Sequence, residues 1–176
     1  INGDKVFLRN ETNCAVFPLT GYAPMDQESW ETLFKTYQSY GINSVRFHSW
    51  CPPEAAFYAA DKLGLYLQPE LSCWDGGMLD NDVKRNYYSK EAYAIVKEYA
   101  NHPSFVMLSF GNELSYSQEN YQYADQLIQG LKEKDSTRLY APGSNIGFGG
   151  TSPSPNADFF TAQHFVNKQA RGSYGG

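Results

Sequence analysis

The sequence predicts an α/β fold in which helices cover a parallel sheet, and two observations lead to it. Short apolar runs alternate along the chain with segments of helical periodicity, as they do in parallel sheets. Several runs also end in polar residues, and parallel strands gather such residues at one edge, in a barrel as in a doubly wound sheet. No GxGxxG or GxxxxGK(S/T) motif follows the first run, so a nucleotide-binding sheet is poorly supported.

The expected strands are the short apolar runs. The run at 104–110 (SFVMLSF) is the most apolar, and the run at 43–48 (NSVRFH) has the composition of a buried strand. In chain order the expected strands cover residues 5–9, 43–48, 65–71, 104–110, 138–141 and 159–165.

The expected helices are segments whose apolar residues recur three and four positions apart. Trp30, Phe34 and Tyr37 form such a face, between a capping residue at Asp26 and a helix-ending Gly41. In chain order the expected helices cover residues 26–40, 53–63, 89–100 and 119–134.

Composition limits the classes of partner. The net charge is −5 and no basic block is present, which argues against nucleic acid and against an anionic membrane surface. Aromatic residues are abundant, with 14 Tyr, 11 Phe and 3 Trp. Because sugar rings stack on aromatic faces, an oligosaccharide or polysaccharide is the more natural partner.

Length and end segments predict one domain over 1–176. No apolar stretch approaches 18 residues and no signal peptide opens the chain, although the periplasm or the cell exterior is favoured for the parent protein.

The three cysteines lie far apart without a CxxC pair, and the acidic group at 75–82 lacks EF-hand spacing. We therefore expect no metal and no cofactor.

Glu113 is the candidate catalytic residue. It follows the strand at 104–110 directly, in the run Gly111-Asn112-Glu113, and would therefore face the site at the strand ends. A carboxyl group held there is able to act as a general acid or base, and the neighbouring Asn112 amide suits a hydrogen bond to a sugar hydroxyl. The alternative is an ordinary loop carboxylate in water.

Several segments together resemble the barrel domain of glycoside hydrolase family 2. The opening is similar to the family's NGKPVFLRG, a later strand to its G-x-N-x-V-R-x-S/H, and another pair of segments to its NHPS and SxGNE motifs. The likeness runs in order from residue 1 to about 115. The segments that carry it are 2–9 (NGDKVFLR), 41–48 (GINSVRFH), 51–57 (CPPEAAF), 60–66 (ADKLGLY), 101–104 (NHPS) and 109–113 (SFGNE).

The resemblance implies a (β/α)8 TIM barrel, here truncated to about six β/α units, because a barrel typically needs about 250 residues. It also implies a retaining β-glycosidase similar to β-galactosidases, β-glucuronidases and β-mannosidases, with Glu113 as general acid/base. Glu70 would support the site by pairing with Arg46, and a buried pair of this kind would orient the catalytic carboxylates more than stabilise the fold.

Further candidates for substrate binding stand at or after the expected strand ends. Arg46 would hold a carboxylate through its two-pronged guanidinium, His48 would bond a sugar hydroxyl, and Trp74 would stack on a sugar ring, although Trp in a loop is as often packing. The complete set of expected substrate-binding residues is Asn112, Arg46, His48, Trp74, Asn145 and His164.

The nucleophile is expected to lie outside this chain. In the resembled family it is a Glu at the end of the seventh strand, whereas six strands are expected here and Glu119 and Glu133 fall on a helix. The chain alone would then be inactive or nearly so, and the parent chain would carry further domains. The alternative is a non-catalytic carbohydrate-binding or interaction module on a barrel-like α/β fold, with Glu113 only a hydrogen-bonding group.

Overall fold

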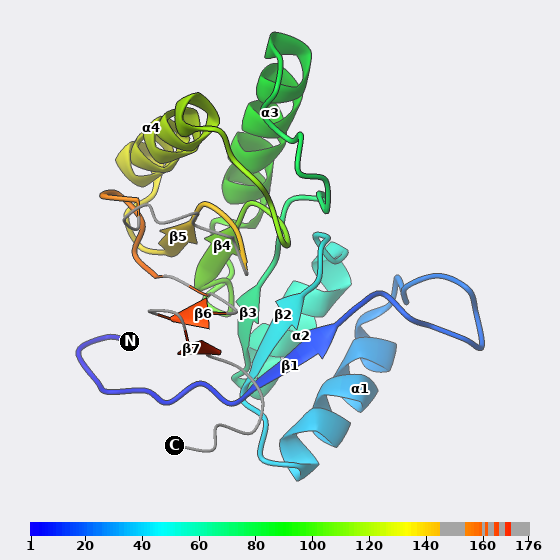
Figure 1. The fold of residues 1–176 in the computed structure, drawn as a ribbon. Coiled ribbons are helices and arrows are strands. Elements are labelled where there is room, and N and C mark those ends of the chain that lie inside the picture. The colour runs from blue at the N-terminus through cyan, green and yellow to red at the C-terminus, as the bar shows by residue number, and fades with distance from the viewer. Residues whose placement is uncertain (145–153, 160, 162–163, 166–167, 170–176) are drawn as a thin grey trace.

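The computed structural model describes residues 1–144, 154–159, 161, 164–165 and 168–169. Five short strands succeed one another in chain order and all pair in parallel (Figure 1). Parallel bridges from Leu67 to Phe105 and from Glu70 to Ser109 join the third strand to the fourth. The strands are β1 (Asn10–Asn13), β2 (Ser44–Phe47), β3 (Tyr66–Gln68), β4 (Met107–Ser109) and β5 (Leu139–Ala141).

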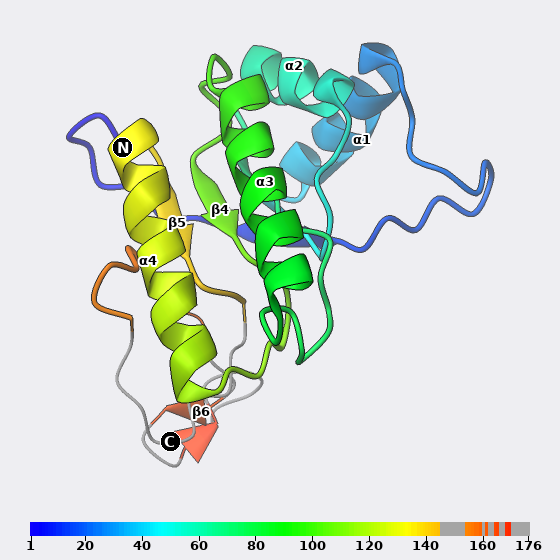
Figure 2. The same cartoon turned by 90° about the horizontal axis from the view of Figure 1, so that it is seen from above.

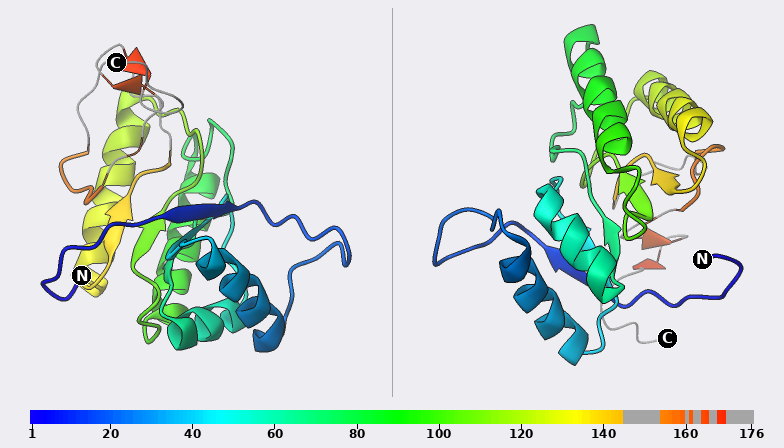
Figure 3. Two further views of the ribbon diagram at one scale, coloured as in Figure 1. Left: turned by 90° about the horizontal axis from the view of Figure 1, so that it is seen from below. Right: turned by 180° about the vertical axis from the view of Figure 1, so that it is seen from behind.

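A helix follows each of the first four strands, which is the repeating unit of a (β/α)8 barrel. Helix α1 packs against α2, and α3 lies beside α4 (Figure 2). Seen from behind, α1 and α2 lie side by side in front of the strands (Figure 3, right). None of the helices among the described residues is long and apolar enough to cross a membrane. The helices are α1 (Gln27–Ser39), α2 (Glu54–Leu63), α3 (Asp82–Tyr99) and α4 (Gln118–Lys134).

Local sequence signals set the ends of α1 and α2 as predicted. The Asp26 side chain caps α1 by accepting a hydrogen bond from the Ser29 N–H at 2.8 Å. Trp30 and Phe34 on its inner face are fully buried. Helix α2 ends at Gly64, whose φ of 73° is the left-handed conformation that terminates helices and favours glycine.

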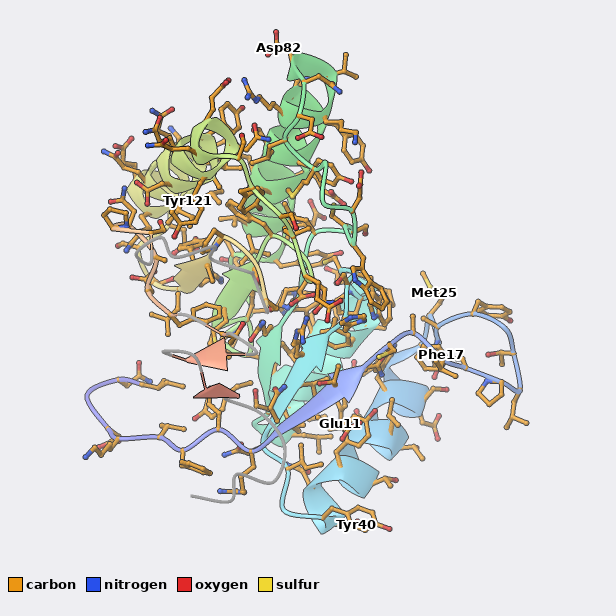
Figure 4. The ribbon with its side chains drawn as sticks, in the orientation of Figure 1. Glu11, Phe17, Met25, Tyr40, Asp82 and Tyr121 are labelled. Atoms are coloured by element: carbon orange, nitrogen blue, oxygen red, sulfur yellow. The ribbon has the colours of Figure 1, made fainter. Side chains whose placement is uncertain are left out.

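Helix α3 begins at Asp82, seven residues before the predicted start at residue 89. Asn81 caps it, because its side chain accepts a hydrogen bond from the Lys84 N–H at 3.0 Å. Asp82 lies at the top of Figure 4, and neither it nor Val83 is buried. The first turns therefore carry no apolar periodicity from which their helical state is predictable.

The first strand also differs from its prediction. The apolar run at 5–9 precedes β1, and Phe7 within it is 78 % exposed. The Asn43 side chain bonds both the Arg9 N–H and the Phe7 carbonyl, and the pairing with β2 starts at Asn10 opposite Ser44. The strand therefore lies in the polar segment that follows the apolar run, next to these contacts.

The expected sixth parallel strand at 159–165 is not found in the described part of that segment. Residues 159 and 161 carry no strand, and β6 (His164–Phe165) pairs antiparallel with β7 (Lys168–Gln169). Two residues separate β6 from β7, and antiparallel strands are able to join through so short a connection, whereas parallel strands need a long crossover.

An aromatic cluster closes the core beneath the loop between β1 and α1. Phe17 in this loop meets Trp30 with ring centroids 5.8 Å apart and Trp50 at 6.4 Å, while Met25 in the same loop is 73 % exposed (Figure 4). Trp50 also packs edge-on against Phe47 at 5.4 Å. Of the two loop tryptophans at 50 and 74, the first is therefore a packing residue.

The three free cysteines differ in exposure, and we expect their reactivity to follow it. Cys14 is exposed, Cys73 is buried, and burial raises the pKa of the half-buried Cys51 thiol to about 12. Because the thiolate is the reactive form, iodoacetamide is expected to alkylate Cys14 first in the native chain. Peptide mass spectrometry checks the order, and Cys14→Ser is expected to abolish the fast phase. Equal rates at Cys51 and Cys14 would contradict it.

Candidate active site

Polar side chains from the carboxyl ends of successive strands meet in one cluster. The Arg46 guanidinium, at the end of β2, donates to both carboxylate oxygens of Glu70, from Nε at 2.7 Å and from Nη2 at 3.2 Å. Nη2 also donates to Oδ1 of Asn112, after β4, at 2.7 Å. The predicted pairing of Arg46 with Glu70 is confirmed, and Asn112 joins it as a third partner.

Glu70 is fully buried and held from several sides. Besides Arg46, the hydroxyl of Ser49 donates to it at 2.9 Å and the hydroxyl of Ser144, just after β5, donates to Oε1. Charge-assisted hydrogen bonds of this kind offset the cost of removing a carboxylate from water. Ser49 and Ser144 are missing from the predicted site, although Ser144 stands at a strand end where the same reasoning selected its neighbour Asn145.

A strained turn after β4 presents Glu113. Gly111 has a φ of +133°, and a side chain there would overlap the carbonyl oxygen of Cys73, so only glycine fits. The Glu113 N–H donates to the Ser144 carbonyl at 2.8 Å, and Glu113 itself has a φ of +52°. The backbone is thereby fixed on both sides, while the Glu113 side chain remains exposed at the edge of the cluster.

One aromatic ring contacts Glu113, and a second ring packs against the first. The indole Nε1–H of Trp74 donates to Oε2 of Glu113 at 3.2 Å. The His48 ring meets Trp74 edge to face, with centroids 4.7 Å apart and planes at 81°. The structure therefore brings His48 and Trp74 together with Glu113, and Trp74 keeps 64 % of its surface exposed.

The remaining predicted substrate-binding residues are placed less fully. Asn145 lies outside the described residues, and of His164 only the backbone, in β6, is described. Within the part of the chain that the structure describes, no three His, Cys, Asp or Glu side chains gather closely enough to hold a metal ion.

The arrangement separates two carboxyl groups by environment. Glu70 is buried and fully engaged, which suits it to hold neighbouring groups in place. Glu113 is exposed beside aromatic rings, which suits it to exchange a proton with a bound molecule.

Residues 1–146 match the profile of the family described as "Glycosyl hydrolases family 2, TIM barrel domain". The chain belongs to this family. The match confirms both the resemblance in the sequence and the barrel class of the fold. As a family 2 chain it carries Arg46, Glu70, Asn112 and Glu113 within the matched region.

Curated relatives are similar over most of this chain. A β-galactosidase from Pectobacterium atrosepticum is 26 % identical over 144 residues, and one from Yersinia enterocolitica is likewise 26 % identical over 144 residues. Each alignment covers 78 % of this chain and 13 % of the relative. The chain thus spans a small part of the length of the curated relatives it matches.

Solved structures share the fold. A glycosyl hydrolase family 2 member from Bacteroides cellulosilyticus aligns with a TM-score of 0.67 and 22 % identity, covering 83 % of this chain and 19 % of that one. The β-glucuronidase of Parabacteroides merdae aligns with a TM-score of 0.65 and 21 % identity, covering 82 % and 18 %. The β/α units described above therefore have the same fold as the matching parts of these structures.

Proposed function

We propose that this chain supplies the acid/base part of the active site of a retaining β-glycosidase, similar to a β-galactosidase, that acts on an oligosaccharide or polysaccharide. The carrying observation is the position of Glu113, which is exposed at the carboxyl end of β4 beside the cluster that Arg46 forms with the buried Glu70 and Asn112. Active sites of barrels lie at this end of the strands.

Glu113 would act twice in the reaction. It first protonates the glycosidic oxygen of the leaving group, while a second carboxylate attacks the anomeric carbon and forms a glycosyl-enzyme intermediate. Glu113, now ionised, then takes a proton from the water that releases the sugar. Its exposure allows both the leaving group and this water to reach it.

Glu70 is unsuited to be the second carboxylate. It is fully buried, and Arg46, Ser49 and Ser144 already occupy its oxygens. Its role in the proposal is to hold Arg46, which in turn orients Asn112 and a carboxylate of the site. The nucleophile would come from sequence outside this chain, in keeping with the greater length of the curated relatives.

The aromatic and amide side chains would bind the sugar. The Asn112 amide and the His48 ring are proposed to bond sugar hydroxyls, and Trp74 offers an exposed face to a sugar ring. Asn145 and His164 remain proposed sugar contacts on the sequence argument alone.

The proposal predicts that the 176-residue chain alone hydrolyses glycosides very inefficiently. The complete polypeptide is expected to hydrolyse them with retention of configuration. Turnover of aryl β-glycosides by the chain alone is expected to be lower by several orders of magnitude, because the nucleophile is missing. Proton NMR of the first product tests the stereochemistry. An α-configured first product from a β-glycoside, or full turnover by the chain alone, would contradict the proposal.

A further inference from the structure

We propose that Trp74 is a positioning residue for Glu113, because its indole N–H holds the carboxylate through Oε2. The contact rests on the structure, and its use in catalysis rests on the function proposed above. This role differs from that of a stacking platform, because it acts on the acid/base group and not on the sugar.

The acceptor of the Trp74 indole distinguishes it from the other tryptophans. All three tryptophans lie in the described part of the chain, and each indole N–H donates. Trp30 donates to the Pro24 carbonyl at 2.8 Å and Trp50 to the Asn13 carbonyl at 3.1 Å, both within the packed core. Trp74 alone among them donates to a carboxylate, that of Glu113.

The indole chemistry makes this contact directional. Indole Nε1–H is a donor only, so it engages a lone pair on Oε2 and never competes for a proton on the carboxyl group. The His48 ring lies edge-on against the indole at 4.7 Å and restricts its rotation. The carboxyl plane of Glu113 is thus constrained at a site where its own side chain is exposed.

The loop that carries Trp74 is tied down on both of its sides. Lys84 in α3 donates to Oδ2 of Asp75 and to the Gly77 carbonyl, both at 2.9 Å. Asn120, near the start of α4, donates to Oδ1 of Asp80 at 2.8 Å. Helix α4 follows Glu113 in the chain. The contact from Asn120 to Asp80 therefore links the loop that carries the donor, Trp74, to the segment that carries the acceptor, Glu113.

Arg85 reinforces this connection between the two helices. Its guanidinium donates to the Leu79 carbonyl at 2.8 Å, to Glu119 at 2.7 Å and to Asn120 at 2.9 Å. Although 64 % of Trp74 is exposed, its backbone belongs to a loop with several fixed points. A rigid loop of this kind is what a positioning contact requires.

Indole NMR tests the contact without any catalytic activity. The ¹⁵N-labelled chain has three indole N–H resonances, and the one absent in Trp74→Phe belongs to Trp74. This resonance is expected to move in Glu113→Gln, because a neutral amide then replaces the carboxylate that accepts the indole N–H. The resonances of Trp30 and Trp50, which donate to backbone carbonyls, serve as internal controls. A Trp74 resonance that is indifferent to Glu113→Gln overturns the proposal.

Kinetics of the complete polypeptide test the role. Trp74→Phe keeps an aromatic face and removes the N–H, so we expect kcat on substrates with poor leaving groups to fall about tenfold, with KM nearly unchanged. Substrates with good leaving groups, which need little protonation, are expected to lose much less. A raised KM with unchanged kcat would show that the indole acts on substrate binding alone and would overturn the positioning role. If the polypeptide hydrolyses no glycoside, the proposed function fails while NMR still decides the contact.

Discussion

Glu113→Gln is expected to lower kcat/KM for aryl β-glycosides with poor leaving groups by about 10²- to 10⁴-fold in the complete polypeptide. The amide keeps the size of the side chain and still forms hydrogen bonds, yet it has no acidic proton to transfer to the departing oxygen. Substrates whose leaving groups depart without protonation should form the glycosyl-enzyme at a nearly normal rate. Steady-state and burst kinetics on a series of leaving groups measure this difference.

A matched control comes from another exposed glutamate. Glu98→Gln in α3 makes the same chemical change at a solvent-facing position away from the cluster and is expected to leave the kinetics unchanged. If Glu113→Gln and Glu98→Gln behave alike, Glu113 is no acid/base. Retained binding of the sugar in both variants, with no hydrolysis to lose, would favour the carbohydrate-binding module instead.

Arg46→Met is expected to lower the free energy of unfolding by about 3–5 kcal/mol. The substitution leaves the fully buried Glu70 carboxylate without its cation, and the remaining donors, Ser49, Gln68 and Ser144, are neutral. Removing one partner of a buried ion pair costs more than the pair contributes, because the other charge stays out of water. Urea denaturation followed by tryptophan fluorescence measures the loss.

Two comparisons separate the buried charge from lost packing. The double variant Arg46→Met, Glu70→Leu removes both charges and is expected to recover much of the stability. Lys35→Met breaks the ion pair with Glu31 on the surface of α1, where the Lys35 side chain is 61 % exposed, and is expected to change stability little. A double variant no more stable than Arg46→Met would show that packing, and not the charge, explains the effect.

Much of the fold was predictable because its helix ends and strands depend on residues that are close in sequence. The Asp26 cap, the Gly64 helix end and the apolar strand at 104–110 each depend on neighbours in sequence. Predictions were wrong at the first strand and at the start of α3. The Asn43 side chain bonds Arg9 and Phe7, 34 and 36 positions away, beside the first strand. The early start of α3 has a local reason, because the Asn81 cap precedes turns with no apolar face.

The candidate site shows the same division. Arg46, Glu70, Asn112 and Glu113 were predicted because each stands at a strand end, and parallel strands bring their carboxyl ends to one edge. The indole bond from Trp74 to Glu113 was not predicted, since 39 positions separate the two residues and no periodicity relates them.

The sequence by itself determined the family, the alternation of strands and helices, and the residue types at the strand ends. Only the tertiary structure decided which carboxyl group is buried and which is exposed. Ser144 and Arg46 enclose Glu70, whereas the turn at Gly111 carries Glu113 outward to Trp74. The reason is physical, since solvent exposure and hydrogen-bond partners arise from elements packed together across the barrel, and these distinguish two glutamates that are chemically identical in the chain.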